Sequence, residues 1–184
     1  GAKRIIYGLP FLSITEQVES EVLKILKGYE CFVQRIDSKS TNTRFDEIQK
    51  ELDENPSEKL LQELEALEFQ DDTFGYPFII TTFVRIFETL LGNKNHELMK
   101  LPNFSNCVFL LDEIQSLPPR LYGFFVAYLD KFCKLTGSFA IVSTATQPAL
   151  RLPDDNKEAK DFFLDYEPPF KLLSLSHYEN PVFN

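Results

Sequence analysis

A chain of 184 residues in which 43% of the side chains are apolar is expected to fold as one domain with a substantial core. Its apolar runs are all shorter than the roughly 18 residues of a membrane-spanning helix, and it shows no secretory signal, so we expect a cytoplasmic protein without a membrane segment. The net charge of −9 argues against a strongly basic surface for nucleic acid, although all of it arises between Asp46 and Asp72.

Short apolar runs alternate with helical patterns along the first part of the chain. The first strand is expected from Ile5 to Leu9 and ends before Pro10. Apolar residues at helical spacing then predict a helix that begins with a capping serine, Ser13, and ends at Gly28. A second strand is expected over residues 31–36.

Residues 44–70 are predicted to form two charged helices, interrupted at Asn55-Pro56-Ser57. The stretch from Asp46 to Asp72 contains eleven acidic residues and two lysines, whereas the rest of the chain has 17 acidic and 17 basic residues. Leucines at positions 60, 61, 64 and 67 give it one apolar face. We therefore expect an acidic helical insertion, about residues 44–72, that packs by this face and lies away from nucleic acid phosphates.

The second part of the chain repeats the alternation of strands and helices. We expect strands at 78–82, 106–111 and 138–143, a helix at 83–91, and another from Pro118-Pro119 to about Leu135. Residues 151–184 form a C-terminal segment of mixed pattern. Because the strands are apolar runs rather than alternating ones, they are expected to be parallel and buried between two layers of helices, which is an α/β fold.

Polar signatures follow four of the expected strands, at the sheet edge where parallel α/β sheets place their ligand sites. They are Pro10 to Ser13, Thr81-Thr82, Asp112-Glu113 and Thr144-Ala145-Thr146. An acidic pair after a buried strand suits nucleotide hydrolysis, in which an Asp holds Mg²⁺ and a Glu activates water. The same pair could merely cap the next helix, and these residues alone leave both interpretations open.

The sequence around the acidic pair resembles motifs two and three of superfamily-two helicases, in the form found in the CRISPR-associated helicase of type I systems. The resemblance rests on Asp112-Glu113-Ile114-Gln115, on Leu117-Pro118-Pro119, and on Ser143-Thr144-Ala145-Thr146-Gln147-Pro148. Residues 9–17 are similar to motif Ia of that family, and residues 79–83 to its next conserved strand. These segments occur in order between about residues 4 and 150.

This resemblance implies a RecA-like three-layer fold with a mostly parallel sheet. Residues 1–150 would form part of the first motor domain, incomplete at the N-terminal strand that carries the phosphate loop, and residues 151–184 would lead toward a second motor domain. The implied activity is ATP-dependent translocation on single-stranded DNA during CRISPR interference, an antiviral defence, with a CRISPR RNA-guided surveillance complex and a nuclease domain or subunit as partners. Another superfamily-two helicase, or a non-catalytic binding module on the same scaffold, remains an alternative.

The resemblance also implies roles for individual residues, with ATP and Mg²⁺ as cofactors. Asp112 would hold Mg²⁺ through water, and Glu113 would be the hydrolytic base. Gln115, together with the hydroxyls of the nucleotide-site residues Thr144 and Thr146, would couple the nucleotide to the nucleic acid. The residues along the single strand would be Pro10, Ser13, Thr81 and Thr82.

The chain departs from the helicase pattern in one respect, because it contains no G-x-x-x-x-G-K-[ST] sequence. We expect this phosphate-binding loop to precede the first strand in a longer protein, so the isolated chain should not hydrolyse ATP. One side of the strand at 138–143 should then be unpaired. We expect a second copy to pair with it, a terminal segment such as 170–175 to fill the gap, or marginal stability.

The three cysteines, Cys31, Cys107 and Cys133, are far apart in the sequence and have apolar neighbours. They are expected to be buried free thiols of a reducing compartment. The two histidines, His96 and His177, have no partner at metal-ligand spacing, so no zinc site is expected.

Overall fold

The fold was obtained as a computed structural model, which describes residues 1–40 and 42–144. Within these residues, five strands form one sheet in the order β2-β3-β1-β4-β5, and every pair of neighbours is parallel. The strands are β1 (Arg4–Leu9), β2 (Val33–Ile36), β3 (Phe78–Thr82), β4 (Cys107–Leu111) and β5 (Phe139–Val142). The predicted α/β fold with a parallel sheet is thus confirmed, and the architecture is consistent with a RecA-like domain.

The helices follow the predicted pattern closely. They are α1 (Leu12–Ile25), α2 (Thr43–Glu54), α3 (Glu58–Asp72), α4 (Phe83–Leu91), α5 (Asn95–Leu98) and α6 (Pro119–Thr136), with 3-10 turns η1 (Glu30–Phe32), η2 (Leu101–Phe104) and η3 (Ile114–Ser116). The predicted cap of α1 is wrong, because Phe11 occupies the N-cap position without a side-chain hydrogen bond and Ser13 lies inside the first turn. The turns and α5 are too short for sequence periodicity to reveal.

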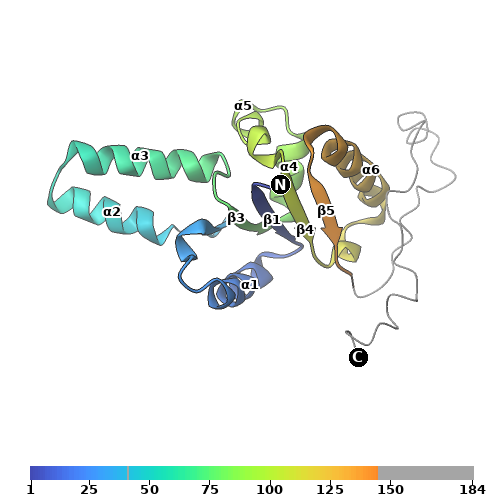
Figure 1. Cartoon of the computed structure of the whole chain (residues 1–184), viewed down its shortest axis with the longest axis horizontal. Helices are drawn as coiled ribbons and strands as arrows, with labels where there is room; N and C mark the ends of the chain where they lie inside the picture. The colour runs from blue at the N-terminus through green and yellow to red at the C-terminus, as the bar shows by residue number, and fades with distance from the viewer. Residues whose placement is uncertain (41, 145–184) are drawn as a thin grey trace.

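Helices cover both faces of the sheet, but unequally (Figure 1). The larger core lies under α4 and α6, and it joins strand residues such as Ile79 and Phe109 to Ile86 of α4 and Phe125 of α6. On the opposite face, α1 packs over β1, β2 and β3, where the core contains Leu9, Val22, Val33 and Ile80.

The strand β5 is covered on one face only. Ala140 and Val142 pack against the core under α6. The side chains that alternate with them, Phe139 and Ile141, are 65% and 56% exposed. The expectation that every strand is buried between two helix layers is therefore wrong for β5. This strand is also at the edge of the sheet and pairs, among the described strands, with β4 alone, which is the edge position expected from the sequence.

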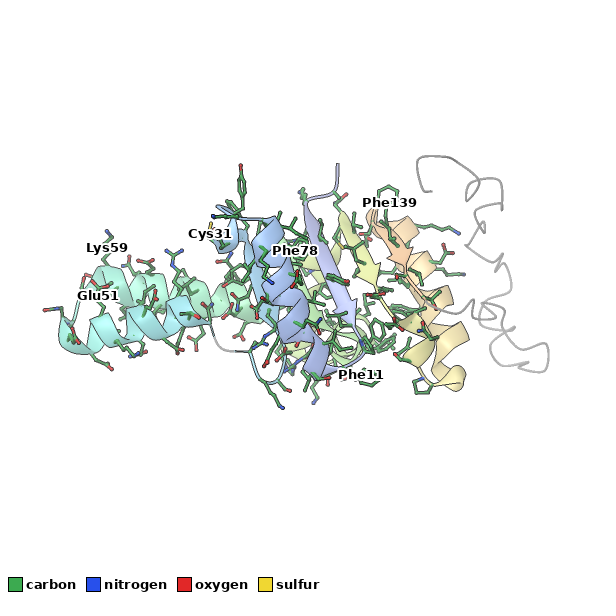
Figure 2. The ribbon with its side chains drawn as sticks, turned by 90° about the horizontal axis from the view of Figure 1, so that it is seen from below. Phe11, Cys31, Glu51, Lys59, Phe78 and Phe139 are labelled. Carbon is green, nitrogen blue, oxygen red and sulfur yellow. The ribbon has the colours of Figure 1, made fainter. Side chains whose placement is uncertain are left out.

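The helices α2 and α3 form an antiparallel hairpin that projects beyond the β2 edge of the sheet (Figure 1, Figure 2). A small core of its own, Ile48, Leu64 and Leu67, holds the two helices together. At the base of the hairpin, the side-chain amide of Asn42 donates hydrogen bonds to the carboxylate of Asp71, at 2.9 and 3.2 Å. The two ends of the hairpin are therefore tied to each other where they join the sheet.

The expectation for the cysteines is correct for two of the three. Cys107 and Cys133 are buried free thiols, whereas Cys31 is exposed in η1. Within residues 1–40 and 42–144, no group of three or more His, Cys, Asp or Glu side chains is arranged to hold a metal ion. In the same part of the chain, no helix combines the length and the apolar character needed to cross a membrane.

Candidate functional site

Two carboxylates follow β4 in a tight backbone turn. The N–H of Asp112 donates to the carbonyl of Gly8 on β1, at 3.1 Å, so Asp112 still belongs to the hydrogen-bonded end of the sheet. Glu113 has φ 57° and ψ 38°, a left-handed conformation that is uncommon for a residue with a side chain. Its N–H donates to Oδ1 of Asp112 at 3.0 Å. This turn directs the chain from β4 into η3 and places both carboxylates at the carboxyl edge of the sheet.

Tyr7 of β1 is a member of this site that the sequence analysis missed. Its hydroxyl donates to Oδ2 of Asp112, at 3.2 Å. Burial, followed by the nearby negative charge of Asp112, raises the pKa of Tyr7, so the hydroxyl keeps its proton at neutral pH. The contact follows from the register between β1 and β4, which aligns Tyr7 with Leu110 and places Asp112 two residues further along the same face.

A chain of hydrogen bonds connects the acidic pair to the end of β5. The amide nitrogen of Gln115 donates to Oε2 of Glu113, and the hydroxyl of Thr144 donates to Oε1 of Gln115 at 2.5 Å. The backbone of Ile114 also donates to the carbonyl of Ser143, at 3.5 Å. The structure thus places Asp112, Glu113, Gln115 and Thr144 in one connected group. Thr146, the other residue predicted for this site, lies outside the described residues.

The two carboxylates fit a magnesium ion that is shared with a substrate. Mg²⁺ is commonly held by one or two carboxylates together with substrate phosphates and water, whereas an all-protein site needs more ligands. Asp112 and Glu113 are each partly exposed, and the described residues supply no third acidic or imidazole ligand beside them. Two partly exposed carboxylates are therefore a donor set that Mg²⁺ could use only together with ligands from a phosphorylated substrate and water.

A second feature lies at the carboxyl ends of β1 and β3. Pro10 and Thr82 line a hollow of about 480 Å³, together with Phe11, Leu12, Ser38, Val84, Arg85 and Glu88. Thr82 caps α4, since its hydroxyl oxygen accepts a hydrogen bond from the N–H of Arg85 at 3.5 Å. Ser13 is exposed in the first turn of α1. Phe11, which the sequence analysis did not select, is one of the residues that line this hollow and is 57% exposed.

Thr81 has to be removed from the predicted nucleic-acid contacts. Its side chain is fully buried, and its hydroxyl donates to the carbonyl of Ile36 at 2.6 Å. The reason is that Thr81 lies on the same face of β3 as Ile79, which belongs to the core under α4 and α6. Thr81 therefore links β3 to the end of β2 and is not accessible to a ligand.

Comparison with known proteins supports a helicase relation. No family model matches the chain. Its sequence is 28% identical over 151 residues to the CRISPR-associated nuclease/helicase Cas3 of Haloferax volcanii, a match that covers 79% of this chain. The chain covers 16% of the length of that protein. The chain is thus similar to one part of a Cas3-type nuclease/helicase.

Proposed function

We propose that this chain is the part of the first motor domain of an ATP-dependent helicase that carries the catalytic carboxylates. The connected group Asp112, Glu113, Gln115 and Thr144 is the observation that carries the proposal. It joins two neighbouring strand ends at the edge where nucleotides bind in parallel α/β sheets. Sequence similarity to Cas3 agrees with this assignment.

In this proposal, Glu113 is the general base that orients and deprotonates the attacking water. The amide of Gln115 holds one of its carboxylate oxygens, and Thr144 holds Gln115 in turn, so the base has a defined position. Mg²⁺, when bound with ATP, neutralises the charge that develops on the phosphates. Asp112 would hold this ion through water.

Single-stranded DNA would lie along Pro10 and the exposed Ser13, beside the hollow at the ends of β1 and β3, which the largely buried Thr82 helps to line. The first turns of α1 and α4 begin here, and helix starts favour phosphate groups through their free N–H groups and their dipole. The activity would serve CRISPR interference in the cytoplasm, together with an RNA-guided surveillance complex and a nuclease domain or subunit. These partners are proposed from the similarity to Cas3.

The open side of the sheet is consistent with a motor domain that needs a further element. The edge of β5 and the exposed Phe139 and Ile141 adjoin the strand that precedes Asp112. An added strand with its helix would pair with this edge, cover these side chains and bring a phosphate-binding loop beside the carboxylates. No such loop sequence occurs among the 184 residues, so the chain alone is proposed to be inactive.

The lack of a phosphate-loop sequence is also the observation that favours the second candidate, a non-catalytic binding module on a helicase-like scaffold. A superfamily-two helicase of another kind is the third candidate for the same residues. The gene sequence before Ala2 separates the binding module from the two helicase candidates, because a Gly-Lys-Ser or Gly-Lys-Thr loop there supports a nucleotide-hydrolysing enzyme.

The test of the proposal is Glu113→Gln in the full-length gene product. We expect DNA-stimulated ATP hydrolysis to fall at least about 100-fold, because the general base is lost. The dissociation constant for ATP should change less than about twofold, because Gln keeps the size of the side chain and the phosphate contacts.

Glu21→Gln serves as the matched control, since Glu21 is an exposed residue of α1 that pairs only with Lys24 among the ion pairs of the described residues. It should leave hydrolysis unchanged. Hydrolysis at the normal rate by Glu113→Gln would contradict the role of Glu113. Hydrolysis by the isolated 184-residue chain above that of its own Glu113→Gln variant would contradict the need for an added phosphate loop.

A further inference from the structure

The carboxylate of Asp112 is held from two sides. Oδ1 accepts the N–H of Glu113 at 3.0 Å, and Oδ2 accepts the hydroxyl of Tyr7 at 3.2 Å. The first donor is a backbone group that any residue except proline would supply at position 113. The second donor is a side chain from a different strand, so it depends on the identity of residue 7.

We propose that Tyr7 is a positioning residue for Mg²⁺, which acts by fixing the orientation of the Asp112 carboxylate. The inference rests on the proposed function, in which Asp112 holds the ion. Partners that hydrogen-bond to a metal ligand fix its orientation, and their loss typically weakens metal binding about 10–100-fold. Nothing in the sequence pattern of an acidic pair identifies this partner, because it comes from β1.

The position of Tyr7 is fixed by the sheet. Its neighbours across the strands are Ile80 on one side and Leu110 on the other. Its ring packs with the core under α1, which contains Leu9, Val22 and Ile80. The ring is therefore anchored on the covered part of the sheet, while its hydroxyl reaches the carboxylate that follows β4.

Tyr128 provides a matched control on the other face. Its hydroxyl donates to the carbonyl of Leu90 at 2.7 Å, which joins α6 to α4 away from Asp112. Tyr7→Phe and Tyr128→Phe each remove one oxygen atom from a partly buried tyrosine. The net contribution of one such hydrogen bond to folding is small, so both variants are expected to fold.

The experiment measures Mn²⁺ binding in the full-length gene product, by electron paramagnetic resonance, in the presence of the non-hydrolysable analogue AMP-PNP. We expect Tyr7→Phe to raise the Mn²⁺ dissociation constant about tenfold, and Tyr128→Phe to leave it within about twofold. Affinity for AMP-PNP in EDTA should be equal for wild type and Tyr7→Phe, because Tyr7 acts only through the metal ligand. In an Asp112→Asn background, Tyr7→Phe should have no additional effect.

The outcomes separate this inference from the proposed function. If Asp112→Asn weakens Mn²⁺ binding but Tyr7→Phe does not, the role of Tyr7 is wrong and that of Asp112 stands. If wild type and Asp112→Asn bind Mn²⁺ equally, the proposed function itself fails. An equal loss of AMP-PNP affinity with and without metal in Tyr7→Phe would mean a general structural effect and would also overturn the inference.

Discussion

The sheet has two halves, β2-β3-β1 and β4-β5, whose strands are similar short apolar runs. The two halves differ in whether a helix covers the α1 face of the sheet. Ile80 on β3 and Ile141 on β5 belong to one row across the sheet, which runs through Tyr7 and Leu110. Ile80 is fully buried under α1, whereas Ile141 is 56% exposed. An apolar run therefore predicts a strand, but it does not predict whether helices pack on both faces of that strand. The carboxylates of the candidate site follow β4, at the start of the half that is left open.

The sharpest test of this comparison replaces the same residue type in both halves. Ile80→Ala should lower the free energy of unfolding by about 2–5 kcal/mol, because it removes buried methyl and methylene groups and leaves a cavity. Ile141→Ala should lower it by less than about 0.5 kcal/mol, since the side chain is largely in water. Urea denaturation of the 184-residue chain, followed by circular dichroism, measures both.

Equal losses in the two variants would show that β5 is as well covered as β3 in solution. Such a result would mean that another copy or another segment protects Ile141. In that event, Ile141→Ala should also change the sedimentation behaviour of the chain or the protection of its backbone amides.

The opposite face gives the second test, because the core under α4 and α6 extends across both halves. Burial raises the pKa of the Cys107 thiol to about 11 and that of Cys133 to about 12. Thiolates react and thiols do not, so both groups should be nearly inert near neutral pH. We expect Cys31, which is exposed, to react with Ellman's reagent at pH 8 at least about 100-fold faster than the other two.

Denaturant should expose Cys107 and Cys133 and make all three thiols reactive. A Cys31→Ser variant isolates the two slow thiols and serves as the control for their rates. Fast reaction of Cys133 in the native protein would show that α6 does not close this face over β5, and the contrast between the two faces would then be lost.

The third test concerns the open edge of β5. An exposed apolar strand edge is a template for pairing with another chain, and a lysine on such a strand opposes that pairing. We expect the 184-residue chain to self-associate at high concentration, and Ile141→Lys to raise the dissociation constant of this association about tenfold. Analytical ultracentrifugation measures it, with Leu61→Lys on α3 as a control at a similarly exposed position. Unchanged association in Ile141→Lys would place the contact elsewhere.

Local patterns in the sequence were sufficient for the strands, for the main helices and for the acidic pair. Strand runs and helix periods are local, and α6 ends at Thr136 with Gly137 in a left-handed conformation, close to the end expected near Leu135. Features that depend on distant partners were not predictable in this way. Tyr7 reaches Asp112 across strands, Thr81 is buried by its contact with β2, and Cys31 is exposed because η1 lies outside both cores.

The hairpin α2–α3 also bears on how this chain could vary among organisms or be modified in the laboratory. Asn42 and Asp71 join its two ends at the base, and its helices pack mainly on each other. Its outer turns could therefore be lengthened, shortened or fused to a fluorescent label without moving β2 or β3. The crossover itself must remain, because parallel neighbours need a connection of about a dozen residues or more. This separation makes the hairpin a convenient attachment point for reporting on the domain without disturbing the carboxylates.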